Sequence, residues 1–148
     1  MKILDLTAGN RAVWFDKKYR DATFVDIRPE VLPDLVADAR ALPPDMEGFD
    51  LILFDPPHDN YGANGRMTAS YGHFTLPHIR ETIAGGGKEA HRVSRPDALM
   101  ALKWHNHGLA LNTVLRLLAP YWEPLFGHGV SPATKRNRHT SWVLLRRK

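Results

Sequence analysis

Carboxylates stand at the ends of four short apolar segments in the first half of the chain. Asp5 lies within residues 2–6, just ahead of Gly9, while Asp26, Asp38 and Asp55 close or follow residues 22–27, 34–38 and 49–54. A carboxylate accepts hydrogen bonds from ribose hydroxyls or an adenine amine, and glycine lets the backbone approach a ligand closely. Any one of these acids alone is better explained as a turn or capping residue. As an ordered set they suggest a pocket for an adenosine-like ligand.

The segments that must position these acids alternate between strand and helix. Apolar runs predict strands at residues 2–6, 22–27, 34–38, 49–54, 98–104, 122–126 and 140–145. Helices are expected at 11–19, from 28–30, at 76–83 and 88–95 with a break at Gly85–Gly87, and at 109–118. Alternation predicts an α/β fold with a mostly parallel sheet and helices on both faces, and the two last strands predict one antiparallel strand. Parallel sheets bind ligands at the carboxyl ends of their strands, which is where the acids lie.

Composition narrows the class of protein. The 148 residues suit one domain, 1–148, and the absence of cysteine excludes disulfides and thiolate metal sites; no metal is expected.

The charge is unevenly distributed along the chain. Residues 1–85 hold 9 Lys/Arg against 13 Asp/Glu, whereas residues 86–148 hold 11 against 3. The basic half suits nucleic acid (DNA or RNA) as a partner, and equally a solvated basic surface. With no signal peptide and no apolar run of ~20 residues, we expect a cytoplasmic protein without membrane contact.

From Ile3 to Leu145 the sequence resembles the class I methyltransferases that use S-adenosylmethionine (SAM), and small phage-encoded methyltransferases have a similar shape. Residues 5–9 resemble the family's SAM-binding loop, Asp26 its ribose-binding acid and Asp38 the acid near the SAM adenine. The resemblance implies SAM as cofactor and a Rossmann-like seven-stranded sheet with a reversed last strand. The cofactor contacts that it implies are Asp5, Thr7, Ala8, Gly9, Asn10, Asp26, Ile27, Asp38, Ala39 and Asp55.

The run Asp55-Pro56-Pro57-His58 resembles the (Asp/Asn)-Pro-Pro-(Tyr/Phe/Trp) motif of the amino-methyltransferases, and these four are the candidate catalytic residues. An exocyclic amine is a poor nucleophile because its lone pair is delocalised into the ring. The Asp55 carboxylate and the Pro56 carbonyl, held rigid by Pro57, would accept its hydrogens and stabilise the charge that develops on nitrogen.

Two positions depart from the family's pattern. The SAM-binding loop usually has a further glycine two residues after Gly9, where this chain has Arg11. The fourth motif position is usually aromatic, and here it is His58, which can stack, hydrogen-bond or take a proton.

The predicted activity is methylation of a nucleobase amine, adenine N6 or cytosine N4, as in DNA methylation or on RNA. Candidate substrate contacts are Tyr61, Lys103, Trp104, Lys135, Arg136 and Arg138. Residues 59–96 leave no room for a separate recognition domain, so a homodimer or partner subunit is a candidate source of target recognition. Methylation of a protein amide or a small molecule, and a non-catalytic relic that binds SAM or nucleic acid, remain open alternatives.

Overall fold

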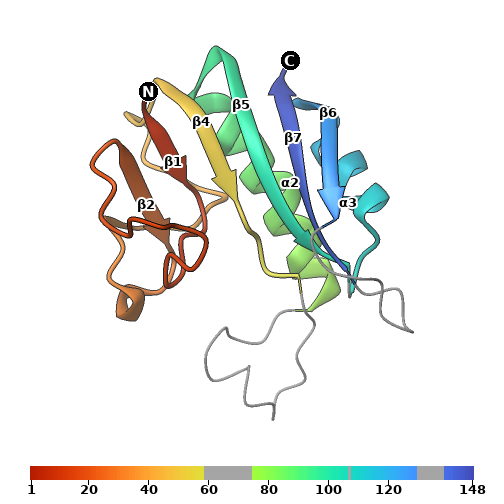
Figure 1. Cartoon of the computed structure of the whole chain (residues 1–148), viewed down its shortest axis with the longest axis horizontal. Helices are drawn as coiled ribbons and strands as arrows, with labels where there is room; N and C mark the ends of the chain where they lie inside the picture. The colour runs from red at the N-terminus through yellow and green to blue at the C-terminus, as the bar shows by residue number, and fades with distance from the viewer. Residues whose placement is uncertain (59–74, 107, 130–138) are drawn as a thin grey trace.

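The computed structural model describes residues 1–58, 75–106, 108–129 and 139–148, and its centre is a seven-stranded sheet (Figure 1). The strand order is β3-β2-β1-β4-β5-β7-β6. The strands are β1 (Ile3–Asp5), β2 (Ala22–Asp26), β3 (Leu35–Val36), β4 (Phe49–Phe54), β5 (Ser94–His105), β6 (Trp122–Gly129) and β7 (Thr140–Arg147). β7 runs antiparallel to both β5 and β6, and the other pairs are parallel. The predicted mostly parallel sheet with one antiparallel strand is confirmed.

Both described α-helices, α2 (Leu76–Val93) and α3 (Leu111–Leu118), pack against each other and lie behind the sheet in Figure 1. Their apolar side chains join those of the strands in one buried core, which includes Ile83, Leu118 and Trp122. Among the described residues no α-helix covers the opposite face, where we had expected helices as well. A single 3-10 turn, η1 (Pro29–Val31), follows β2.

The helix expected at residues 11–19 is wrong, because this segment forms a series of turns. Trp14 packs edge-on against Phe24 of β2 at 5.1 Å between ring centroids, and the Arg11 guanidinium lies 3.9 Å from the centre of the same Phe24 ring. These contacts let a short irregular segment cover the face of β2 that a helix would otherwise cover.

The break expected at Gly85–Gly87 is also wrong, since α2 runs through all three glycines. A Cβ at Gly86 would lie 2.8 Å from Cζ of Phe54, and one at Gly87 would collide with the Leu118 side chain. Trp122 also donates its ring N–H to the Gly87 carbonyl at 2.8 Å. The glycines therefore allow close packing of α2 on β4 and α3, which outweighs their weak helix propensity.

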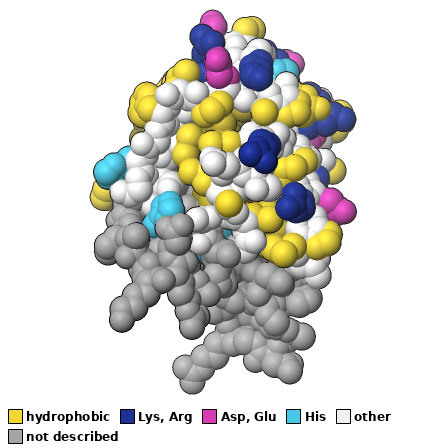
Figure 2. All heavy atoms as spheres, turned by 90° about the vertical axis from the view of Figure 1, so that its right-hand side faces the viewer, with side chains coloured by type: hydrophobic (Ala, Val, Ile, Leu, Met, Phe, Trp, Pro, Cys, Tyr) yellow, Lys and Arg dark blue, Asp and Glu magenta, His cyan; other side chains and the backbone are white. Residues whose placement is uncertain are grey.

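The outer edge of the sheet, at β6, carries exposed apolar side chains, and Figure 2 faces this edge. Leu125 and Phe126 are 47% and 70% exposed, beside a shallow groove of about 300 Å³ between β6 and α3. Pro124 cannot donate a backbone hydrogen bond and thereby discourages pairing with a further strand. No helix within the described part of the chain has the length and apolar character to span a membrane.

Candidate functional site

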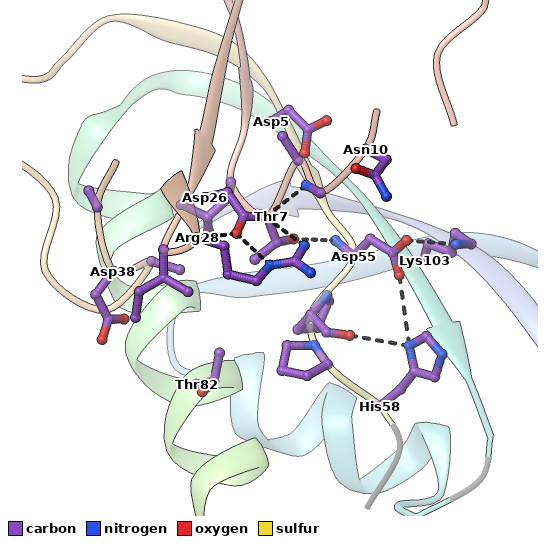
Figure 3. A pocket seen from close by; sticks show the side chains of 18 of the residues that line it. Asp5, Thr7, Asn10, Asp26, Arg28, Asp38, Asp55, His58, Thr82 and Lys103 are labelled. Atoms are coloured by element: carbon purple, nitrogen blue, oxygen red, sulfur yellow. Dashed lines mark hydrogen bonds and ion pairs between the residues drawn. The ribbon is translucent and has the colours of Figure 1, made fainter. Parts of the chain in front are cut away.

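A cavity of about 560 Å³ opens where β1, β2, β3 and β4 end, between these strand ends and the start of α2 (Figure 3). Its volume is in the range of small-molecule and cofactor sites. Every residue predicted to contact the cofactor lines this cavity, as do the four candidate catalytic residues and Lys103. Five segments of the chain thus bring their chemically useful side chains to one place.

The loop after β1 adopts the backbone conformation that the cavity requires. Gly9 has φ +50°, and its N–H donates to Oδ2 of Asp26 at 2.8 Å. Arg11, at the position where the resembled family has glycine, also has a positive φ of 55°. Its guanidinium bonds the carbonyls of Lys17 at 2.6 Å and Leu32 at 3.0 Å, which helps to hold a conformation that glycine would adopt without strain.

Asp26, at the end of β2, is buried and already surrounded by donors. Oδ2 accepts from Gly9, and Oδ1 accepts from the backbone N–H of Arg28 at 2.9 Å and from its Nε at 3.0 Å. Each carboxylate oxygen has about two acceptor sites. A ribose hydroxyl that bonded Asp26 would therefore replace the Arg28 guanidinium (Figure 3).

Asp38 has a similar partner, two residues further on. Arg40 binds it with Nη2 to Oδ2 at 2.6 Å and Nε to both oxygens at 3.0 Å. The Arg40 hydrogen bonds hold the pKa of Asp38 below its usual range. Asp38 is thus an ionised acceptor at the end of the cavity beyond β3.

Asp5 differs electrostatically from the other acids. It is 1% exposed, and burial raises its pKa from 3.8 to about 7. The ring N–H of Trp14, which donates to Oδ2 at 2.7 Å, lowers the pKa in part, while the charges of Asp55 and Asp26 raise it. Desolvation dominates, so Asp5 changes charge near neutral pH.

Asp55, directly after β4, is held at two points. Its N–H donates to Oγ1 of Thr7 at 3.0 Å, which ties the motif to the loop after β1. Lys103 of β5 donates to Oδ2 at 2.6 Å. Oδ1 is buried and has no hydrogen-bond partner among the described residues. A buried carboxylate oxygen without a donor is costly, and a donor from outside the described residues would satisfy it.

His58 faces the same oxygen. Its Nδ1 lies 3.3 Å from the Pro56 carbonyl oxygen and 3.9 Å from Oδ1 of Asp55 (Figure 3). Its ring meets that of Trp104 edge-on at 6.0 Å and that of His105 at 5.5 Å. The imidazole is therefore within hydrogen-bond distance of the Pro56 carbonyl oxygen and close to Oδ1 of Asp55.

No protein-family model and no curated protein sequence matches this chain. Solved structures do match. The PH0226 protein of Pyrococcus horikoshii superposes with a TM-score of 0.68 over 99% of this chain and 82% of its own, at 15% identity. A TehB-like SAM-dependent methyltransferase from Corynebacterium glutamicum gives 0.66 over 99% and 80%, at 15% identity. The N-methyltransferase NodS of Bradyrhizobium japonicum, solved with S-adenosyl-L-homocysteine, gives 0.65 over 99% and 77%, at 12% identity.

The chain has the Rossmann-like fold of SAM-dependent methyltransferases. The sequence analysis missed four polar residues of the cavity: Arg28, Arg40, His78 and Thr82. The two arginines had a visible signal, because each stands two residues after a strand-ending aspartate. His78 and Thr82 lie on one side of the first turns of α2, a face that only the packed structure reveals.

Trp104 requires a correction, since it was predicted to touch substrate. It is fully buried, and its ring N–H donates to the Leu109 carbonyl at 3.0 Å. Alternation along β5 turns Lys103 toward the cavity and Trp104 into the core. The other predicted substrate contacts, Tyr61, Lys135, Arg136 and Arg138, lie outside the described residues. Within the described part of the chain, no group of three His, Asp or Glu side chains is placed to hold a metal ion.

Proposed function

We propose that this protein is a SAM-dependent N-methyltransferase and that its acceptor is the exocyclic amine of a nucleobase, adenine N6 or cytosine N4, in DNA or RNA. The fold alone does not carry this proposal, because one fold supports many functions. The observation that carries it is the pair of acceptors at the cavity wall: the unsatisfied Oδ1 of Asp55 and the neighbouring Pro56 carbonyl.

The end of the cavity away from Asp55 would hold the adenosine part of SAM. The cavity is lined by Asp26 and Asp38, which the resemblance assigns to the ribose and the adenine, and by Asp5, a buried acid that would favour a ligand carrying positive charge. SAM, when bound, supplies a methyl group on a positively charged sulfur that needs no further activation. Arg28 would leave Asp26 when the ribose binds, and its guanidinium would then turn to solvent.

The residues of the motif would act mainly by orientation and charge. Asp55 and Pro56 would accept the two hydrogens of the amine, drawing its nitrogen toward a tetrahedral form with an available lone pair. The Thr7 hydroxyl fixes the Asp55 backbone, and Lys103 fixes its other carboxylate oxygen. Pre-positioning of this kind supplies much of a methyl-transfer rate enhancement.

The test is transfer of a labelled methyl group from SAM to single-stranded DNA, duplex DNA, RNA and a protein extract, offered separately. We expect label in a nucleic-acid fraction, in N6-methyladenine or N4-methylcytosine after digestion. The Asp55→Ala variant should give none, and Asp45→Ala, which removes an exposed carboxylate, should match the wild type. Label found only in protein would mean that the methyl acceptor is a protein amide and not a nucleobase.

One observation favours a second candidate, a non-catalytic relic that binds SAM or nucleic acid. Both acids predicted for the adenosine part are already paired with arginines, at 3.0 Å for Asp26 and 2.6 Å for Asp38. If SAM does not displace these arginines from the two acids, the affinity for the cofactor is weak. Binding of nucleic acid without methyl transfer under any condition would support this candidate.

A further inference from the structure

The atoms that would bind a substrate amine already face an imidazole. Nδ1 of His58 lies 3.3 Å from the Pro56 carbonyl oxygen and 3.9 Å from Oδ1 of Asp55. An amine nitrogen bonded to both oxygens would occupy the region between them and the imidazole. Facing two oxygens, Nδ1 carries the ring proton and donates it to the Pro56 carbonyl. An amine that took over this carbonyl would displace that bond, and in the tautomer with the proton on Nε2 the Nδ1 lone pair would face the amine nitrogen.

Asp55 itself is poorly suited to remove a proton. Oδ2 is already occupied by the Lys103 ammonium at 2.6 Å, and Oδ1 is the oxygen that would hold the amine in place, so neither oxygen is left to carry a proton away. An imidazole nitrogen has a lone pair that can take up a proton, and histidine is the side chain that most often serves as a general base.

We propose that His58 is the proton acceptor of the reaction, an inference that rests on the proposed function. The amine nitrogen forms a bond to the methyl carbon as the carbon–sulfur bond breaks, with that electron pair staying on sulfur. The nitrogen, now positively charged, gives one proton to the imidazole. The products are the methylated amine, the neutral thioether S-adenosylhomocysteine and an imidazolium ring. His58 is 27% exposed on its side chain, so the proton can pass on to water.

Other charged and titratable groups surround His58 and must be separated from it in any pH profile. Asp55 and Lys103 face it across the cavity from β4 and β5, and His105 lies 5.5 Å away between ring centroids. His78 lines the same cavity from α2. Asp5 lines the cavity as well, and burial raises its pKa to about 7.

The test is the single-turnover methyl-transfer rate from pH 5 to 9 at saturating SAM, for the wild type and two variants. His58→Phe restores an aromatic ring at the motif's fourth position and cannot take a proton. His58→Gln can still donate to the Pro56 carbonyl but cannot act as a base at these pH values. An Asp5→Asn background removes the buried carboxyl whose pKa is raised to about 7, and because Asp5 lines the cavity only the position of its inflection is compared, not its rate. His91→Gln removes an imidazole that packs against Tyr121, outside the cavity.

We expect the wild-type and His91→Gln rates to rise with pH to a plateau, with the same inflection in the Asp5→Asn background. Both His58 variants should lose the inflection and be slower by ~100-fold or more at pH 8, the usual size of general base catalysis. Unchanged S-adenosylhomocysteine affinity by calorimetry would show that both remain folded. A His58→Phe enzyme with wild-type rate, or a slower one with the inflection retained, would overturn the inference while leaving the proposed function intact. Absence of transfer by the wild type would overturn both.

Discussion

Replacing Asp5 by Asn should make the protein more stable at neutral and alkaline pH. Burial raises the Asp5 pKa from 3.8 to about 7, so the folded protein holds a proton that the unfolded chain releases. The free energy of unfolding therefore falls as pH rises through this window, and the full penalty applies above pH 7. At about 1.36 kcal/mol per pKa unit, the raised pKa corresponds to a penalty of up to about 4 kcal/mol.

Asparagine has nearly the same shape and can still accept the Trp14 ring N–H that Asp5 accepts at 2.7 Å. We expect Asp5→Asn and wild type to have similar stability near pH 4, to differ by about 1.5 kcal/mol at pH 5 and by up to about 4 kcal/mol at pH 8. Urea unfolding followed by tryptophan fluorescence at each pH measures this difference.

Asp50→Asn is the control, because hydrogen bonding from the Lys2 backbone N–H lowers the pKa of Asp50. Its difference from wild type should therefore stay constant between pH 5 and 8. Parallel stability curves for wild type and Asp5→Asn across this range would refute the account of Asp5. Diverging stability curves would show that Asp5 becomes ionised in the folded protein as the pH rises. Its negative charge would then favour a cationic ligand, so the affinity for SAM should rise from pH 6 to 8.

Three further substitutions test other parts of the site. Asp55→Ala should abolish methyl transfer while S-adenosylhomocysteine affinity stays within about threefold, because the carboxylate acts on the amine; loss of binding would mean that Asp55 holds the cofactor instead. Asp26→Asn should weaken S-adenosylhomocysteine binding about 10- to 100-fold by calorimetry, since hydrogen bonds to a charged acceptor are worth about 1.5–3 kcal/mol; unchanged affinity would remove Asp26 from the ribose site. Arg11→Gly should lower the unfolding free energy by about 1–2 kcal/mol, because the lost contacts with two carbonyls and the Phe24 ring exceed the relieved strain; a more stable variant would show that strain dominates.

The sequence was informative wherever one face of a strand must be buried. Phe49–Phe54 and the strand-ending acids could be predicted because a parallel sheet fixes both the apolar pattern and the edge at which its strands end. The cavity therefore follows from local patterns at four strands.

Long-range packing could not be predicted in the same way. The continuity of α2 depends on Phe54 and Leu118, which are distant in sequence and press against Gly86 and Gly87. The turns at residues 11–19 form in place of a helix, with Trp14 and Arg11 packed on Phe24 of another strand. The Lys103–Asp55 ion pair likewise joins residues 48 positions apart, and only the register of β4 against β5 brings them together.

Calorimetric titration with S-adenosylhomocysteine, with NAD as a control ligand, shows whether this cavity binds the cofactor. Asp26→Asn serves as the matched variant. We expect saturable binding of one S-adenosylhomocysteine per chain, weaker binding in the variant, and no binding of NAD. Absence of S-adenosylhomocysteine binding, both alone and with nucleic acid added, would contradict the proposal that this cavity holds SAM.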